Sequence, residues 1–262
     1  MSSASLEGAP SLPLPLLEGV LRAALHEDLA AGDLTTEACI DEGTRATAHA
    51  VARSEMVACG GPVFARVFAL LDPELKVQSH VAEGTLVAAG TRLWTVKGAA
   101  RSILMGERVA LNFTQRLSGI ATQTRLYVGA VPGGVATRIT DTRKTTPGLR
   151  AFERYAVRCG GGRNHRDNLG SAILIKDNHI AACGGIDRAI HRAKQRAPHT
   201  SRIECEVDSL AQLDEALAAG ADIVLLDNMP TDDVAEAVRR AKGRALTEAS
   251  GGITLKRVTE LA

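Results

Sequence analysis

Residues 202–228 read RIECEVDSLAQLDEALAAGADIVLLDN. The stretch begins and ends with a short apolar run, and a helix-length segment lies between the two runs. Each run ends in polar or charged residues, with Glu206 and Asp208 after the first and Asp227 and Asn228 after the second. A strand, a helix and a second strand in this order indicate a βαβ unit, in which the strands are parallel and their carboxyl ends meet at one edge.

The same alternation extends through the second half of the chain. Short segments expected as strands lie at 136–140, 172–176, 202–207, 221–227 and 244–249. Each ends in polar or charged residues, which places Asp, Arg, Lys, His and Glu side chains together on the C-terminal rim of a (β/α) barrel, where such barrels build active sites. Strand ends that simply reach solvent would explain Asp and Asn, but they explain Arg, Lys, His and Glu poorly.

The first half of the chain, to about residue 130, has an α+β pattern instead. It is expected to contain a helix at 15–28, strands within 44–59 and 76–98, a helix at 61–71 and a long helix over 100–131 that is interrupted near Gly119. A complete eight-fold barrel takes roughly 250 residues. The second half is much shorter and stops within a helix, so we expect an incomplete or truncated barrel.

Composition excludes several classes of protein. Apolar residues make up 45% and charged residues 23%, as in ordinary globular proteins, whereas aromatic residues at 3% are too few for a base-stacking nucleic-acid binder. Five cysteines without a C-x-x-C pair fit reduced cytoplasmic thiols better than a disulfide framework. No apolar run is long enough to span a membrane. Residues 1–16 lack the features of a signal peptide and are expected to form a frayed arm.

A basic stretch lies within an otherwise acidic protein. From Arg138 to Lys176 there are nine Lys or Arg residues and three Asp or Glu residues, although the net charge of the chain is only +1. The candidate ligand-binding groups on or near the rim are Arg143, Lys144, His165, Arg166 and Lys176. Arginine binds carboxylate or phosphate through charge-assisted hydrogen bonds, so this cluster indicates a ligand with several negative groups. A freely solvated basic face is the alternative.

Two carboxylates and a glycine pair complete the candidate site. Glu206 and Asp227 would repel a polyanion unless a cation lies between them, which suggests Mg²⁺ with a phosphorylated substrate, or stabilisation of a carbocation-like centre. A structural carboxylate pair bonded to backbone amides is the alternative. Ser250, Gly251 and Gly252 lie between a strand and a helix, where backbone amides can approach a phosphate. A turn followed by a helix N-cap would need the same residues.

Six stretches together resemble the quinolinate phosphoribosyltransferases. They are EDLAAGDLTTEACI (27–40), ERVALNFTQRLSGIAT (107–122), DTRKTTPGLR (141–150), CGGGRNHRDNLGSAILIKDNHI (159–180), ECEVDSLAQLDEALAAGADIVLLDN (204–228) and EASGGITL (248–255). The resemblance implies phosphoribosyl transfer from phosphoribosyl pyrophosphate to quinolinate with decarboxylation, which gives nicotinate mononucleotide, CO2 and pyrophosphate in NAD biosynthesis.

The resemblance also implies an α/β fold made of an N-terminal α/β sandwich domain, 1–130, and a C-terminal incomplete (β/α) barrel domain, 131–262. It implies a homodimer in which the sandwich of one subunit covers the barrel of the other. In the family a further strand, a Gly-containing phosphate loop and closing helices follow the S-G-G motif. Nothing follows Ala262 here, so the last strand and helices of the barrel are expected to be missing.

Site residues follow from the resemblance by position. The quinolinate carboxylates would be bound by Arg143, His165, Arg166, Lys176 and, from the partner subunit, Arg108. The ribose and the Mg²⁺-pyrophosphate would be handled by Lys144, Glu206 and Asp227, with the two carboxylates binding Mg²⁺ directly or through water. Phosphate would be bound by Ser250 and Gly251.

Two other functions fit parts of the same pattern. Lys176 could act as a Schiff-base nucleophile in a barrel lyase, since a strand lysine with a lowered pKa attacks carbonyl groups. A catalytically silent or transport-associated paralogue that binds a related anion would retain the same residues.

Overall fold

The computed structural model describes residues 11–262, so the first ten residues of the expected N-terminal arm lie outside the described residues. Contacts divide the chain into two compact units. The N-terminal unit contains the described residues up to Gly129 together with Arg138–His165, and the C-terminal unit contains Ala130–Thr137 and Arg166–Ala262. The segment 138–165, which the sequence assigns to the C-terminal domain, therefore groups with the N-terminal unit.

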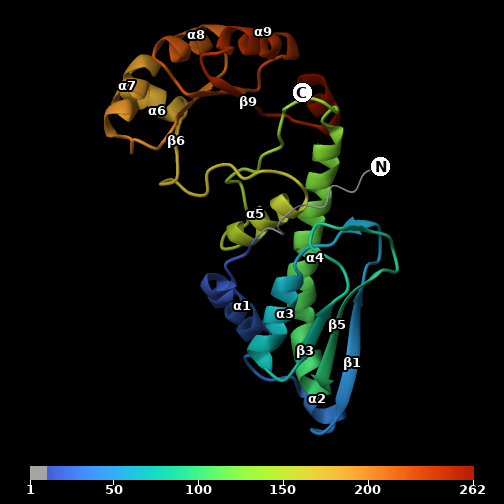
Figure 1. The fold of residues 1–262 in the computed structure, drawn as a ribbon. Helices are drawn as coiled ribbons and strands as arrows, with labels where there is room; N and C mark the ends of the chain where they lie inside the picture. Colours follow the sequence, from blue (N-terminus) through green and yellow to red (C-terminus); the bar gives the residue numbers. More distant parts are fainter. Residues whose placement is uncertain (1–10) are drawn as a thin grey trace. The chain divides into compact units, whose positions relative to one another are not determined.

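The N-terminal unit alternates helices with short strands (Figure 1). Its elements are α1 (Leu14–Leu29), α2 (Leu34–Cys39), β1 (Arg45–Val51), β2 (Met56–Val57), α3 (Gly61–Leu71), β3 (Lys76–Ser79), β4 (Leu86–Val87), β5 (Arg92–Ala99), α4 (Ala100–Ala130) and α5 (Arg150–Cys159). The helices predicted at 15–28 and 61–71 and the strands predicted within 44–59 and 76–98 are confirmed. Pro15 lies in the first turn of α1, where its missing N–H would have no helical partner.

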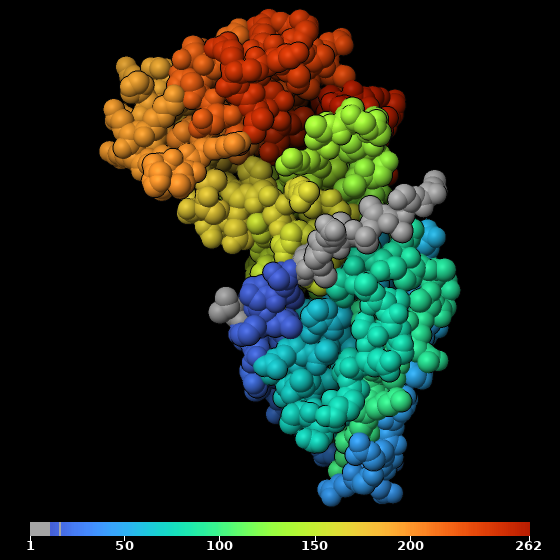
Figure 2. Space-filling view, in the orientation of Figure 1, coloured from blue at the N-terminus to red at the C-terminus, as the bar shows by residue number. Residues whose placement is uncertain are grey.

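The core of this unit lies between an antiparallel sheet and the helices. The sheet has the order β1-β5-β3, and β2 pairs with β4 in a second small ladder. Trp94 and Val96 on β5 are buried among side chains of α3 and α4. The helices α1 and α3 are in contact, and Figure 2 shows their atoms adjoining, dark blue beside cyan. Together these elements form the expected α/β sandwich.

The helix α4 runs without a break from Ala100 to Ala130, so the predicted interruption near Gly119 is wrong. A Cβ at Gly119 would meet nothing within 4 Å, which places this glycine on an open face of the helix. On the opposite side, Leu117, Ser118 and Ala121 are buried. Packing of this buried face outweighs the cost of one helical glycine, about 1 kcal/mol.

The strand predicted at 136–140 is wrong as well. The only pairing there is a parallel bridge between Thr140 and Arg163. It comprises two backbone hydrogen bonds, from Arg163 N to Ile139 O at 2.8 Å and from Asp141 N to Arg163 O at 3.0 Å. Ile139 is flanked by Arg138 and Thr140, so the segment offers too little apolar surface to join a sheet. Residues 138–165 form instead an irregular segment that contains α5.

The C-terminal unit is a parallel sheet with helices packed on one face. Its elements are β6 (Ile173–Ile175), α6 (Asp177–Cys183), α7 (Ile186–Arg196), β7 (Ile203–Val207), α8 (Leu210–Ala218), β8 (Ile223–Asp227), α9 (Thr231–Ala241), β9 (Leu246–Ser250) and α10 (Leu255–Leu261). The four strands follow the order β6-β7-β8-β9, which confirms four of the five predicted strands. Their alternate residues form an apolar core with α7, α8 and α9. This repeated βα arrangement is an open, incomplete (β/α) barrel.

Candidate active site

The face of the parallel sheet away from the apolar core carries the predicted charged residues of the C-terminal unit. Strand register pairs Glu206 with Leu225 and Leu225 with Glu248, and it pairs Asp227 with Ser250. Because residues two apart on a strand share a face, these side chains lie on one side of the sheet. Cys205 and Val207 point to the opposite side, into the core. The sequence prediction that these strand ends meet is confirmed for this sheet.

Two of the predicted ligand-binding groups neutralise each other. The Nζ atom of Lys176, directly after β6, lies 2.8 Å from Oε2 of Glu206 on β7. The lysine side chain is 44% exposed and the glutamate side chain 17% exposed. The backbone of Lys176 is fixed as the first residue of a capping box, since its N–H donates to Nδ1 of His179 at 2.9 Å. This gives His179, for which the sequence indicates no role, a structural one.

Burial and these carboxylates also affect the thiol behind the sheet. Burial, and after it the nearby Glu206 and Glu204 carboxylates that disfavour the thiolate, together raise the pKa of Cys205 to about 11. The thiol is therefore protonated and unreactive at neutral pH.

A tight corner follows β8 and β9. Asn228 has φ 54°, donates from Nδ2 to Oδ2 of Asp227 at 2.9 Å, and donates its backbone N–H to Ser250 O at 2.9 Å. Gly251 has φ 84°, and a Cβ there would overlap the Asn228 amide. Arg257 donates to Gly251 O at 3.2 Å. The glycine is therefore required both by backbone conformation and by the closeness of Asn228.

In the N-terminal unit the cations Arg143 and Lys144 lie on a loop that is hydrogen-bonded to α5, and α5 in turn is bonded to α4. Arg143 O accepts a hydrogen bond from Arg150 Nη2 at 3.4 Å. The buried Glu153 accepts from Arg116 Nε at 2.9 Å and from Thr146 N at 3.4 Å. Lys144 is exposed.

The side chain of Arg143 lacks a partner for one donor. Its Nε atom is buried and has no hydrogen-bond partner among the described residues. A buried guanidinium donor left unsatisfied is costly. An acceptor supplied by a bound anion would satisfy it.

The remaining predicted residues divide between the two units. His165 ends the N-terminal unit's segment 138–165, and its N–H donates to Asp141 Oδ1 at 2.7 Å. Arg108 is an exposed residue of α4. Arg166 belongs to the C-terminal unit and donates to Ala172 O at 3.4 Å. The prediction that five strand ends form one rim is therefore wrong for the first predicted strand, 136–140. Arg143 and Lys144, which come after it, follow no strand of the parallel sheet.

Sequence reasoning missed the polar residues that hold these groups. Asp141, Arg154 and Asn164 form a connected network around His165. Asn228 shapes the Gly251 corner. Asn228 directly follows Asp227, and Asp141 lies two residues before Arg143, so a polar residue close to a predicted ligand-binding group is the available signal.

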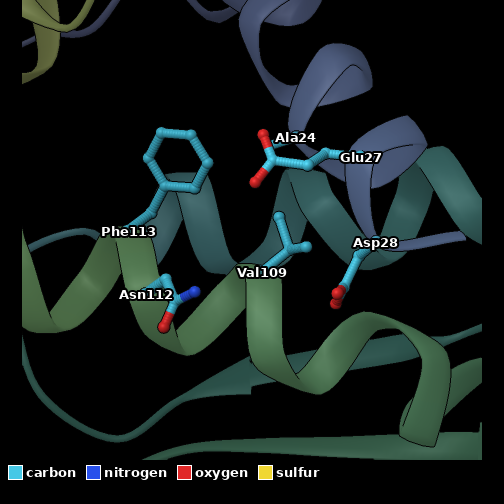
Figure 3. A pocket seen from close by; sticks show the side chains of 6 residues that line it. All are labelled: Ala24, Glu27, Asp28, Val109, Asn112 and Phe113. Atoms are coloured by element: carbon cyan, nitrogen blue, oxygen red, sulfur yellow. The ribbon is translucent and has the colours of Figure 1, made fainter.

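A small cavity of about 90 Å³ lies between α1 and α4 of the N-terminal unit (Figure 3). Its lining comprises Ala24, Glu27, Asp28, Val109, Asn112 and Phe113, with the two carboxylates contributed by α1. The six residues include none of the predicted site residues. Among the described residues, no helix combines the length and the apolar character that crossing a membrane requires.

Comparison with known proteins agrees with this architecture. The model of the quinolinate phosphoribosyl transferase N-terminal domain matches residues 33–118, and that of the C-terminal domain matches residues 120–262. The chain belongs to the quinolinate phosphoribosyl transferase family. The resemblance drawn from the six sequence stretches is therefore confirmed.

Relatives in this family match over most of their length. A probable nicotinate-nucleotide pyrophosphorylase [carboxylating] of Synechocystis is 44% identical over 260 residues, covering 97% of this chain and 88% of the relative. The nicotinate-nucleotide pyrophosphorylase [carboxylating] of Mycobacterium leprae is 45% identical over 245 residues, covering 90% and 84%. The crystal structure of NadC from Streptococcus pyogenes superposes with a TM-score of 0.91 at 44% identity, covering 95% and 88%.

Proposed function

We propose that this chain is a nicotinate-nucleotide pyrophosphorylase (carboxylating), a pentosyltransferase of NAD biosynthesis. It transfers the phosphoribosyl group of phosphoribosyl pyrophosphate to quinolinate and releases CO2 and pyrophosphate, leaving nicotinate mononucleotide. Family membership and the printed names of relatives at 44% and 45% identity support the reaction. The structural observation that carries it is the buried Nε of Arg143, which has no partner in the described part of the chain and which a substrate carboxylate would satisfy.

Quinolinate carries two carboxylates, and the proposed pocket supplies several cationic or hydrogen-bonding groups for them. Arg143, His165, Arg166 and Lys176 bind them, and each charge-assisted hydrogen bond contributes about 1.5–3 kcal/mol. Lys176 is already ion-paired with Glu206. It therefore links the quinolinate pocket to the carboxylates assigned to the second substrate.

The second substrate is assigned to the face of the parallel sheet. Glu206 and Asp227 lie near the ribose, where negative charge stabilises the positive charge that develops on the ribosyl ring as pyrophosphate leaves. Lys144 compensates the negative charge of the leaving group. Ser250 and the backbone of Gly251, at the tight corner after β9, bind phosphate.

The residues present fit a magnesium ion. Glu206 and Asp227 offer hard oxygen ligands on one face of adjacent strands, as Mg²⁺ requires when substrate phosphates and water complete its coordination. In the described part of the chain, Glu206 Oε2 pairs with Lys176 and Asp227 Oδ2 accepts from Asn228, so each carboxylate retains a second oxygen. When bound, Mg²⁺ would offset the charge of the pyrophosphate group.

The test follows product formation directly. Purified protein is mixed with quinolinate, phosphoribosyl pyrophosphate and Mg²⁺, and nicotinate mononucleotide is measured by mass spectrometry. Arg143→Ala should lower kcat/KM for quinolinate by about 100-fold or more, since two charge-assisted hydrogen bonds are lost. Arg239→Ala, at a 72% exposed position on α9, is the matched control and should change nothing. Absence of product from the wild type would refute the proposed reaction.

We also propose a cytoplasmic homodimer in which Arg108 enters the active site of the partner subunit. If so, Arg108→Ala and Arg143→Ala variants are each inactive, but a mixture allowed to exchange subunits regains activity. Random pairing makes half of the dimers mixed, each with one intact site, so about a quarter of wild-type activity should return. No recovery, with subunit exchange verified by mass spectrometry, would place Arg108 in its own subunit's site or outside it.

The Schiff-base alternative is disfavoured by geometry. A lysine nucleophile needs a free amine, whereas Lys176 is held as an ion pair 2.8 Å from a carboxylate. The silent-paralogue alternative is decided by the product assay above.

A further inference from the structure

Asp141 is the one charged residue of the DTRK stretch to which neither the resemblance nor the proposed reaction gives a role. Its side chain is only 6% exposed. It accepts hydrogen bonds from His165 N at 2.7 Å and from Asn164 Nδ2 at 2.5 Å, and it pairs with Arg154 Nη1 at 3.4 Å. A buried carboxylate is tolerated only when donors compensate it, and these three donors all belong to α5 or to the segment that follows it.

The same ion pair holds the other side of His165. Arg154 Nη1 donates to His165 O at 2.9 Å, so Asp141 fixes the N–H of His165 and Arg154 fixes its carbonyl group. Asn164 belongs to the same network: its Nδ2 donates to Arg154 O at 3.0 Å, and its Oδ1 accepts from Arg158 at 2.5 Å. The backbone at His165 is therefore held on both sides by charged groups.

The helix that carries Arg154 is itself firmly anchored. Phe152 and Tyr155 of α5 are 1% exposed and belong to the core of the N-terminal unit. Tyr155 also donates its hydroxyl to Glu83 Oε2 at 2.7 Å. Between α5 and His165, the amides of three glycines (160–162) donate to carbonyl groups of α5, and Arg163 pairs with residues 139–141. Beyond this bridge, the His165 backbone is held by its contacts with Asp141 and Arg154.

We infer that Asp141, together with Arg154, is a positioning residue: the buried ion pair holds the His165 backbone so that the imidazole is oriented for the substrate carboxylate before the substrate binds. Such preorganisation reduces the ordering that binding requires. The inference rests on the proposed role of His165 in binding quinolinate. It explains why an aspartate precedes two cations in a pocket for an anion: Asp141 is turned inward, bonded to donors, and does not face the substrate.

The kinetic test separates positioning from a general loss of stability. Asp141→Ala should raise KM for quinolinate about tenfold, with kcat and KM for phosphoribosyl pyrophosphate changed less than about twofold. Asp141→Asn keeps an acceptor for the His165 N–H, so it should restore most of the quinolinate affinity. Glu18→Gln, which removes the Glu18–Arg66 ion pair between α1 and α3 in the same unit, is the matched control and should leave both KM values unchanged. Equal rises in both KM values, or the same rise in the control, would overturn the inference.

A second measurement does not depend on the reaction. Hydrogen exchange should become at least about tenfold faster at the His165 amide in Asp141→Ala, because the amide loses its buried acceptor, while exchange within α3 stays unchanged. Unchanged exchange at His165 would contradict the inference whatever the kinetics show. If the wild type neither binds nor converts quinolinate, the proposed function fails, and hydrogen exchange alone decides whether Asp141 holds His165.

Discussion

The two regions that carry the candidate ligand-binding groups are built in different ways. On the sheet face of the C-terminal unit, the charged side chains stand on regular parallel strands, and Lys176 and Glu206 compensate each other across adjacent strands. In the segment 138–165 the cations lie on irregular backbone, and buried carboxylates below them bind to other parts of the same unit. Strand register places the first set, whereas individual polar contacts place the second.

This difference has a consequence for mutation. On the sheet face a substitution changes the charge that meets the ligand, but the backbone keeps its hydrogen-bonded ladder. In the segment 138–165 a substitution of a buried carboxylate moves the backbone that carries the cations. Substitutions of charged side chains on the sheet face should therefore act mainly on the reaction, and substitutions of the buried carboxylates in segment 138–165 on both affinity and stability.

On the sheet face, the largest effect is expected at Lys176. Lys176→Met should lower kcat/KM for quinolinate by about 100-fold, because a charge-assisted hydrogen bond is lost and the Glu206 carboxylate is left facing a negative substrate. The melting temperature should change little, since the lysine is 44% exposed. Adding Glu206→Gln should recover part of the quinolinate affinity. A loss below about threefold in the single variant would show that this face does not bind quinolinate.

The corner at the end of the sheet should be the most sensitive position for stability. Gly251→Ala should lower the free energy of unfolding by about 2–3 kcal/mol, because it adds a left-handed backbone penalty to an overlap with Asn228. Gly243→Ala is the matched control: Gly243 has φ 75° but open space around it, so it should cost only about 1 kcal/mol. Urea unfolding measures both. Equal losses would show that the overlap with Asn228 has no effect.

The buried thiol of Cys205, on the other face of the same sheet, should make the free energy of unfolding decrease at alkaline pH. The pKa of the Cys205 thiol is raised by burial to about 11 in the folded protein, above its value of about 8.5 in an unfolded chain. Between these values the unfolded state has lost the proton that the folded state still binds, so stability falls as pH rises. The loss should reach about 3 kcal/mol near pH 11.

Cys205→Ala removes this titration and isolates it from other alkaline groups. The difference in unfolding free energy between wild type and variant should be constant below about pH 8 and should decrease above it. Unfolding curves at several pH values measure it. A difference that is independent of pH would mean that the thiol ionises normally in the folded state.

The smallest effect is expected at Glu153, which is bonded to the loop that carries Arg143 and Lys144. Glu153→Gln weakens the contacts to Arg116 and Thr146, and it should cost about 1 kcal/mol of stability because Arg116 is 43% exposed and therefore partly solvated. It should also raise KM for quinolinate about threefold, since the loop of Arg143 is loosened. Glu236→Gln, which weakens surface ion pairs of α9, should leave KM unchanged. A normal KM for Glu153→Gln would show that the loop is held by other contacts.

The sequence predicts the regular region far better than the irregular one, for a physical reason. The strands that end at Glu206 and Asp227 are apolar runs, and the period of two with intervening helices dictates both their existence and the edge at which they end. The partnership of Lys176 with Glu206 could not be predicted in the same way, because it depends on β6 lying next to β7. His179 and its capping bond to Lys176 depend on a helix start that polarity alone does not locate.

The fold of segment 138–165 cannot be predicted from the periodicity of apolar residues. Its fold depends on two backbone bonds between residues 139–141 and Arg163 and on Asp141 reaching residues more than twenty positions later. Such contacts leave no period in the sequence. The predicted strand at 136–140 depends on a single isoleucine between polar residues, and nothing around Ile139 provides the apolar face that a strand needs.

The unbroken helix α4 also limits how the gene for this protein can change in length. A helix advances 1.5 Å and turns about 100° per residue, so one inserted codon between Arg108 and Arg116 would rotate one arginine about 100° relative to the other. Arg116 could then no longer reach Glu153 while Arg108 kept its present direction. Insertions and deletions should therefore be tolerated in the connections between strands and be absent from the middle of α4, where the number of residues matters as much as their identity.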